Sequence, residues 1–206
     1  MTQRLTRKGQ ATRERILQAA TELIARQGVA GTGTEDVRKA AGVSGSQLYH
    51  YFDSKQALIR AVITRQADAA PVPDQPMMGT LDSFGALRAW ADAAIERQEQ
   101  NDGRGDCTLG SLAGELGAAD EDSRADLSNG FLRWQSLLNA SLLAMRDRGE
   151  LRAGTDLDEL SLALLTALQG GSLLSQTLRD TRPLRAALNA ALAYVHSFAP
   201  GDGTKP

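Results

Sequence analysis

The sequence is poor in the residues that build several common kinds of protein. Cys107 is the single cysteine among 206 residues, so no internal disulfide can form, which suits a reducing compartment. The two histidines, His50 and His196, are 146 residues apart, and no metal spacing, nucleophile motif or phosphate loop is present. We therefore expect no enzyme, no metal and no cofactor.

Strand-forming residues and long apolar runs are also scarce. Aromatic residues make up 4% of the chain, and Ala and Leu dominate over β-branched residues, which favours helices. The longest uncharged run, residues 160–178, contains many Ser, Thr, Gln and Gly residues, so we expect a buried helix there and no membrane contact. The N-terminus is basic where a signal peptide would be apolar, and we expect a cytoplasmic protein.

Charge is distributed unevenly along the chain. Residues 1–65 hold eleven Lys and Arg against five Asp and Glu, whereas residues 66–206 hold twelve against twenty. A basic first third attached to an acidic remainder indicates that only the first third meets a polyanion. Charge alone leaves open a chance clustering of solvated side chains.

Apolar residues recur at helical spacing through most of the chain and predict an all-α fold. Capping signals define several ends: Gly28 as a stop, Thr32 with Glu35 as a capping box, and Ser44 as an N-cap. The predicted helices are 11–27, 32–41, 44–52, 54–69, 83–100, 108–117, 120–148, 156–178 and 183–198.

The first three predicted helices have the arrangement of a three-helix helix-turn-helix head: a helix, a short helix, a turn with glycine and a second short helix. Gly42 separates two short helices, and Val43, Leu48 and Phe52 are expected to pack the unit together. Prolines at 71, 73 and 76 then interrupt the chain and predict a boundary. We expect a DNA-binding head at 1–70 with a disordered basic arm at 1–10, a helical body at 71–199, and a disordered tail at 200–206.

A recognition helix needs short polar residues at its N-terminus, where the bases are nearest. Gln47 can bond adenine in bidentate fashion and Ser46 is a less selective partner. We expect backbone or thymine contacts from Tyr49 and His50, and phosphate contacts from Lys55 and Thr34. Tyr49 and His50 as plain surface residues, and the arm as a merely solvated tail, remain alternatives. The predicted DNA-binding residues are Thr34, Ser44, Gly45, Ser46, Gln47, Tyr49, His50 and Lys55.

Three pieces of the head, "AAGVS", "LYHYF" and "SK.AL", resemble the TetR/AcrR family of transcriptional regulators over residues 11–63. "GDCTLGSLAGEL" and "LQGGSLLSQTLRDTRPLRAAL" are similar to the LmrA/YxaF-like branch. The resemblance implies a homodimer that binds a double-stranded DNA operator and is released by a small hydrophobic, aromatic or flavonoid-like inducer. Gly45 departs from the family, which often has Lys there, and this removes one phosphate contact.

The body is expected to supply both the dimer interface and the inducer pocket. Leu lies on nearly every face between residues 157 and 174, and 183–198 carries a leucine stripe with alanines between, so these two helices predict a four-helix interface. Apolar and amide side chains elsewhere are the pocket candidates, although each may equally be plain core. They are Trp90, Cys107, Leu112, Phe131, Trp134, Gln135, Leu138, Met145 and Gln169.

Two other functions stay open on the sequence. Cys107 follows Asp106 in a Gly-rich loop and is a candidate redox sensor, although only Arg104 is placed to lower its pKa, and a structural or pocket-lining thiol is the simpler interpretation. An architectural DNA-binding protein without a ligand is the other, against which the large body argues.

Overall fold

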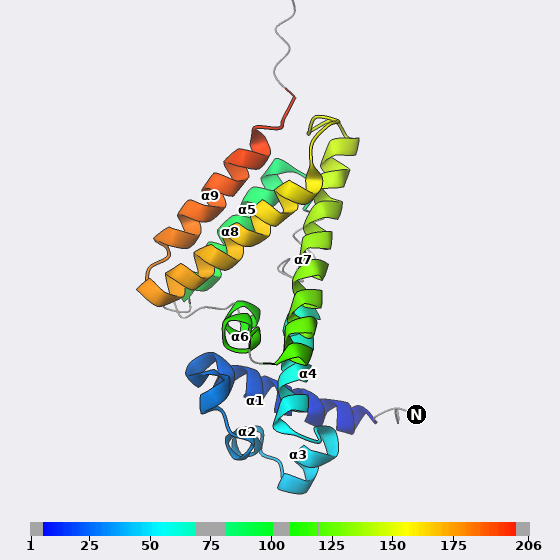
Figure 1. Cartoon of the computed structure of the whole chain (residues 1–206), viewed down its shortest axis with the longest axis vertical. Coiled ribbons are helices and arrows are strands. Elements are labelled where there is room, and N and C mark those ends of the chain that lie inside the picture. Colours follow the sequence, from blue (N-terminus) through cyan, green and yellow to red (C-terminus); the bar gives the residue numbers. More distant parts are fainter. Residues whose placement is uncertain (1–5, 69–80, 101–107, 119, 201–206) are drawn as a thin grey trace, which may run out of the picture. The chain divides into compact units, whose positions relative to one another are not determined.

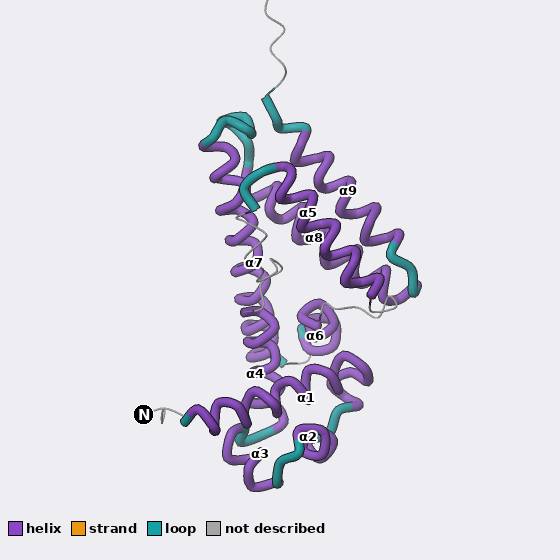
Figure 2. Tube along the Cα trace, turned by 180° about the vertical axis from the view of Figure 1, so that it is seen from behind, coloured by secondary structure: helices purple, strands orange, loops and turns teal. Residues whose placement is uncertain are grey.

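The computed structural model describes residues 6–68, 81–100, 108–118 and 120–200. Within these residues all regular structure is α-helical, which confirms the predicted all-α class (Figures 1 and 2). The chain divides into two compact units. One contains residues 1–68 and 108–130, and the other contains 69–107 and 131–206.

The first unit, called the head below, is built on α1 (Arg7–Gly31). Packed around it are α2 (Thr34–Ala41), α3 (Gly45–Tyr51), α4 (Lys55–Asp68), α6 (Thr108–Leu116) and the first part of α7 (Glu121–Asp147). Figure 1 shows α2 and α3 on one side of α1 and α6 on the other. Buried aliphatic side chains of α1 and α4 form its core, including Ile16, Leu17, Ala20, Val62 and Ile63.

Polar contacts fasten α4 to the start of α7 inside the head. Arg60 Nε donates to Asp126 at 2.6 Å, and Gln56 donates to Asp120 at 2.6 Å. Asp120 also accepts from the side chain and the backbone N–H of Ser123, which caps α7 and lowers the pKa of that carboxyl. Gly130 lies so close to α4 that an added Cβ would stand 2.8 Å from Cβ of Ala67.

The second unit, called the body, contains α5 (Phe84–Gln100), residues 131–147 of α7, α8 (Leu157–Leu178) and α9 (Arg182–His196). Its α8 and α9 lie side by side in both ribbon views. Gly171 of α8 touches α9 so closely that a Cβ there would stand 2.8 Å from Cα of Leu184. The Ser175 hydroxyl accepts from the Leu184 N–H at 3.0 Å, so backbone and side chain fix the crossing together.

Three predictions about the boundaries are wrong. The N-terminal arm is shorter, because the Thr6 hydroxyl accepts from the Gly9 N–H and α1 begins at Arg7. The capping box is displaced: the Thr32 hydroxyl donates to the Gly28 carbonyl, and Asp36 accepts from the N–H of Gly33, which precedes α2. Residues 108–130, assigned to the body, pack with the head because α6 contacts α1 and α4.

The tail at 201–206 and the Pro-containing segment at 69–80 lie outside the described residues. No helix in the described part of the chain is long and apolar enough to span a bilayer.

Candidate nucleic-acid interface

The short helix α3 is held by a reciprocal cap at its start. The Ser44 hydroxyl accepts from the Gln47 N–H at 3.1 Å, and the Gln47 side-chain oxygen accepts from the Ser44 N–H at 2.9 Å. This capping box satisfies two backbone donors that a seven-residue helix would otherwise leave open. The predicted N-cap at Ser44 is therefore present, with Gly45 as the first helical residue.

Apolar anchors fix the opposite side of α3 to the head. Leu48 and Phe52 are 2% and 3% exposed, and Val43 in the preceding turn is also buried. The Arg13 guanidinium of α1 lies 5.3 Å from the centroid of the Phe52 ring, a cation–π contact that covers the end of α3. These contacts leave α3 a single free face.

That free face carries the predicted base-contact residues. Ser46, Gln47, Tyr49 and His50 are all exposed, and Tyr49 keeps 53% of its surface although it is a large aromatic residue. The Ser46 hydroxyl lies 2.9 Å from that of Ser44. Polar side chains at the start of a helix, backed by a buried stripe, are what a major-groove recognition helix requires.

Gln47 has two competing tasks in this arrangement. Its side-chain oxygen is engaged in the cap of α3, whereas bidentate recognition of adenine needs both the oxygen and the amide nitrogen. Gln47 can read a base with its nitrogen alone, by releasing the Ser44 N–H, or by accepting with the second lone pair of the same oxygen.

The turn between α2 and α3 is shaped by one glycine and one arginine. Gly42 adopts φ of 62°, the left-handed conformation that closes a helix and that other residues adopt only at a cost. Arg38 donates from two nitrogens to Glu35 one turn earlier and directs its third nitrogen, Nη1, to the Val43 carbonyl at 3.4 Å. This ion pair lowers the pKa of Glu35, because Arg38 donates to the carboxylate.

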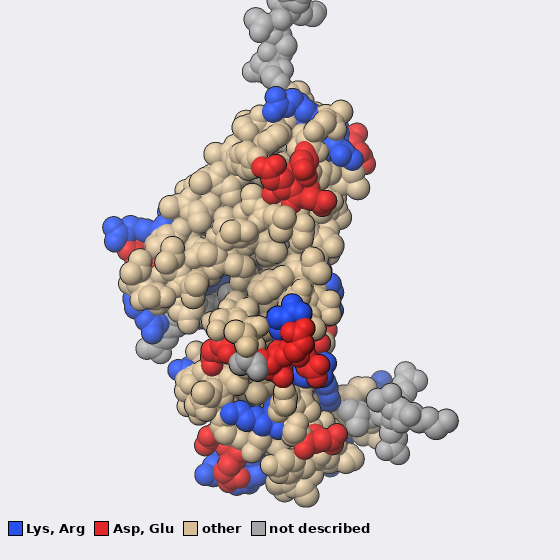
Figure 3. Space-filling view, viewed as in Figure 1, with Lys and Arg blue, Asp and Glu red and all other residues tan. Residues whose placement is uncertain are grey.

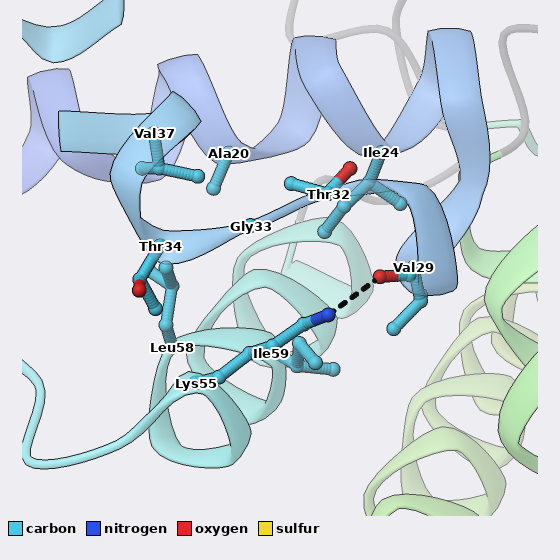
Figure 4. Close-up of a pocket in the computed structure, with 10 residues that line it drawn as sticks. All are labelled: Ala20, Ile24, Val29, Thr32, Gly33, Thr34, Val37, Lys55, Leu58 and Ile59. Atoms are coloured by element: carbon cyan, nitrogen blue, oxygen red, sulfur yellow. Dashed lines mark hydrogen bonds between the residues drawn. The ribbon is translucent and has the colours of Figure 1, made fainter. Parts of the chain in front are cut away.

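Lys55 makes a contact within the head that its sequence position did not reveal. Its ammonium donates to the carbonyl oxygen of Val29 at 2.9 Å, as Figure 4 shows, and its side chain is half-buried. The bond spans from the start of α4 to the end of α1, and the phosphate contact of Lys55 stays a prediction. Thr34, the first residue of α2, directs its hydroxyl away from this bond in Figure 4.

Lys55 and Thr34 line a small apolar depression among α1, α2 and α4. It is partly open to solvent. Its wall is otherwise formed by Ala20, Ile24, Val29, Thr32, Gly33, Val37, Leu58 and Ile59.

The first turn of α1 carries two exposed basic side chains. Arg7 and Lys8 in its first turn are exposed, and neither makes an ion pair with another described residue. Arg4, the third basic residue of the predicted arm, is outside the described residues.

The predicted pocket residues of the body fall into two groups. Trp90, Trp134, Leu138 and Met145 are buried, whereas Phe131, Gln135 and Gln169 are half-buried. The Phe131 and Trp134 rings meet edge to face with centroids 6.2 Å apart.

Two further pocket candidates are placed differently. Leu112 lies on α6, which packs on α1 and α4 in the head, and its side chain is fully buried. Cys107 lies outside the described residues.

One buried polar residue of the body was missed by sequence reasoning. Gln98 on α5 is only 2% exposed, although Gln is normally a surface residue. Its position within the apolar stripe of residues 87, 90, 91, 94 and 95 was the available signal.

The outward face of α8 is apolar. Leu162, Leu173, Leu174 and Leu178 are between 48% and 63% exposed, and no charged residue occurs from Leu160 to Leu178. Figure 3 shows a wide surface without Lys, Arg, Asp or Glu over this helix.

Comparison with known proteins agrees with this geometry. The family profile described as "Bacterial regulatory proteins, tetR family" matches residues 16–62, and "Tetracyclin repressor-like, C-terminal domain" matches residues 84–191. The transcriptional regulator AcuR of Cereibacter sphaeroides is 30% identical over 188 residues, which cover 89% of this chain and 80% of AcuR. The uncharacterised regulator YxaF of Bacillus subtilis is 25% identical over 182 residues, covering 87% and 92%.

A solved structure of a regulator of the same type has a similar fold. The regulatory protein TetR from Rhodobacter sphaeroides superposes with a TM-score of 0.74 at 26% identity, covering 88% of this chain and 97% of that one. These matches, together with the helix-turn-helix and its exposed polar face, establish the family of the chain. The chain belongs to the TetR family of bacterial transcriptional regulators, which bind DNA and are not enzymes.

Proposed function

We propose that the protein is a cytoplasmic, ligand-responsive repressor that binds a palindromic operator as a homodimer and is released by a small hydrophobic inducer. The observation that carries the proposal is the exposed face of α3, which presents Ser46, Gln47, Tyr49 and His50 beyond a buried Leu48 and Phe52. An anchored helix with one polar face has the form needed to enter a major groove.

The first experiment defines the operator. Selection of bound sequences from a random duplex library is expected to return a two-fold symmetric site with half-sites one helical turn apart, roughly 34–36 Å, or a multiple of it. Binding is expected to weaken steeply with salt as phosphate contacts release counterions. If no duplex is enriched and binding ignores salt, the DNA-binding proposal is wrong.

Gln47→Ala is expected to relax base preference at one position of each half-site, because the amide that reads adenine is removed. A lost bidentate contact corresponds to about 1–3 kcal/mol of discrimination. Repeating the selection with the variant measures it.

The control for Gln47→Ala separates base reading from capping. Ser44→Ala removes the other half of the same cap and is expected to weaken all duplexes alike without changing preference. Identical preferences for Gln47→Ala and the wild type would mean that Gln47 only caps α3.

The dimer proposal rests on the outward face of α8. Four exposed leucines on the uncharged stretch of α8 from Leu160 to Leu178 make an apolar patch of the kind that monomers rarely leave open. A two-fold interface that pairs α8 and α9 with their copies would cover it. Sedimentation of the full chain at micromolar concentration is expected to give a dimer, and a monomer would contradict the proposal.

The inducer proposal rests on the composition of the body interior. Trp90 and Trp134 offer buried aromatic surface, and Gln98 adds a buried amide in the same unit. Apolar walls with few polar groups are typical of small-molecule sites.

A panel of small hydrophobic aromatic compounds tests the inducer. At least one is expected to raise the melting temperature and to release the selected duplex. A compound must bind the released form better than the bound form to act in this way. If no compound does both, a ligand-independent architectural role becomes the better account.

A further inference from the structure

The end of α1 is broken at Gly28 and held from two sides. Gly28 has φ of 75° and ψ of 172°, which interrupts the helix before Val29. The Val29 N–H donates to the Glu115 carboxylate at 2.7 Å, and the Val29 carbonyl accepts from Lys55 at 2.9 Å. Both polar groups of one residue are thus bonded to side chains of other helices, α6 and α4.

Glu115 has room to make this contact because Gly28 has no side chain. A Cβ at residue 28 would stand 3.0 Å from the nearer carboxylate oxygen and 3.3 Å from the other. The positive φ and the space for the carboxylate are two separate reasons for glycine at this position.

The clamped segment leads directly into the DNA-binding helices. Val29 is followed by Thr32, whose hydroxyl bridges back to the Gly28 carbonyl at 2.7 Å, and then by Gly33 and α2. Figure 4 shows this path from Val29 past Lys55 to Thr34. A displacement of Val29 would therefore be passed to the start of α2 and, through the turn at Gly42, to α3.

The chain passes between head and body at three places: after residue 68, before residue 108 and after residue 130. Sequence reasoning considered only the first, which leaves from α4. The helix that follows the second passage is α6, which carries Glu115.

We propose that Glu115 is a positioning residue for operator binding. Through the Val29 N–H it sets where α2 begins, and it connects that position to α6. This inference rests on the proposed DNA-binding function, and it names the contact through which a change in α6 reaches the recognition helix.

Glu115→Ala tests the proposal in the full-length protein. A hydrogen bond to a charged acceptor changes an equilibrium by roughly tenfold, so the variant is expected to bind the selected operator about tenfold more weakly. Hydrogen exchange is expected to rise in peptides covering residues 29–41 and to stay unchanged across α8 and α9. Glu115→Gln keeps an accepting oxygen and is expected to recover most of the binding.

Glu121→Ala is the matched control. Glu121 belongs to the same unit and pairs with Arg124 three residues away on the surface. The proposal is overturned if Glu115→Ala equals Glu121→Ala in operator affinity and in exchange at 29–41. It is also overturned if exchange rises in every helix, which would show a general loss of stability.

The two proposals fail in different ways. If the wild type binds no duplex, the DNA-binding function is wrong, and the exchange pattern still decides whether Glu115 holds the end of α1.

Discussion

Replacing Leu48 by alanine is expected to abolish operator binding. Leu48 is 2% exposed and is the one fully buried side chain within α3, so its removal leaves a cavity beneath the recognition helix. A Leu→Ala change at such a site costs about 2–5 kcal/mol of unfolding free energy. Urea unfolding followed by circular dichroism, together with operator titration, measures both effects.

Tyr49→Ala is the matched control for Leu48→Ala. Tyr49 is the next residue along α3 but is 53% exposed, so its removal is expected to leave stability within about 0.5 kcal/mol. It should still weaken binding to all sequences if the side chain meets the DNA backbone. If Leu48→Ala keeps full operator affinity, α3 is not the helix that enters the groove.

Replacing Gly171 by valine is expected to force α8 and α9 apart and to abolish the dimer. Even a Cβ would stand 2.8 Å from the Leu184 backbone and 3.3 Å from the Ala187 side chain, and a backbone atom cannot rotate away. Overpacking of this kind costs about 1–3 kcal/mol, and valine adds two methyl groups beyond the clash. Thermal unfolding and sedimentation of the full chain check the two consequences.

Gly170→Ala is the control for Gly171→Val. A Cβ at Gly170 meets no atom within 4 Å, and alanine favours a helix interior by roughly 1 kcal/mol over glycine. The control is therefore expected to unfold at the same or a higher temperature. Equal stability of Gly171→Val and the wild type would mean that the two helices are not packed as described.

Local signals in the sequence predicted the helices well. The predicted N-cap at Ser44 is present, and the helix expected from residue 156 begins where Asp156 accepts from the Glu159 N–H at 3.0 Å. These interactions join residues three apart, so a short stretch of sequence contains both partners. The family resemblance is also confirmed. Its most specific pieces lie within the helix-turn-helix, so they too can be recognised in a short stretch of sequence.

Contacts between distant residues were not foreseen from the sequence. Glu115 and Val29 are 86 positions apart, and Lys55 and Val29 are 26 apart, so periodicity could not show that either pair meets. The same limit explains why α6 was assigned to the body. The N-terminal arm and the capping box were wrong for a local reason, because Thr6 and Asp36 provide the caps that were expected elsewhere. Gln98 was passed over because a polar residue on an apolar stripe has no partner visible in the sequence.

The discontinuity of the head restricts how this regulator can be re-engineered. A truncated fragment that ends at residue 68 would lack α6, and with it the carboxylate on Val29, and would also lack the Asp120 and Asp126 partners of α4. A new DNA specificity is therefore better introduced by substituting surface residues of α3. A chimera joined at residue 68 would separate residues 1–68 from the segment 108–130 that packs against them.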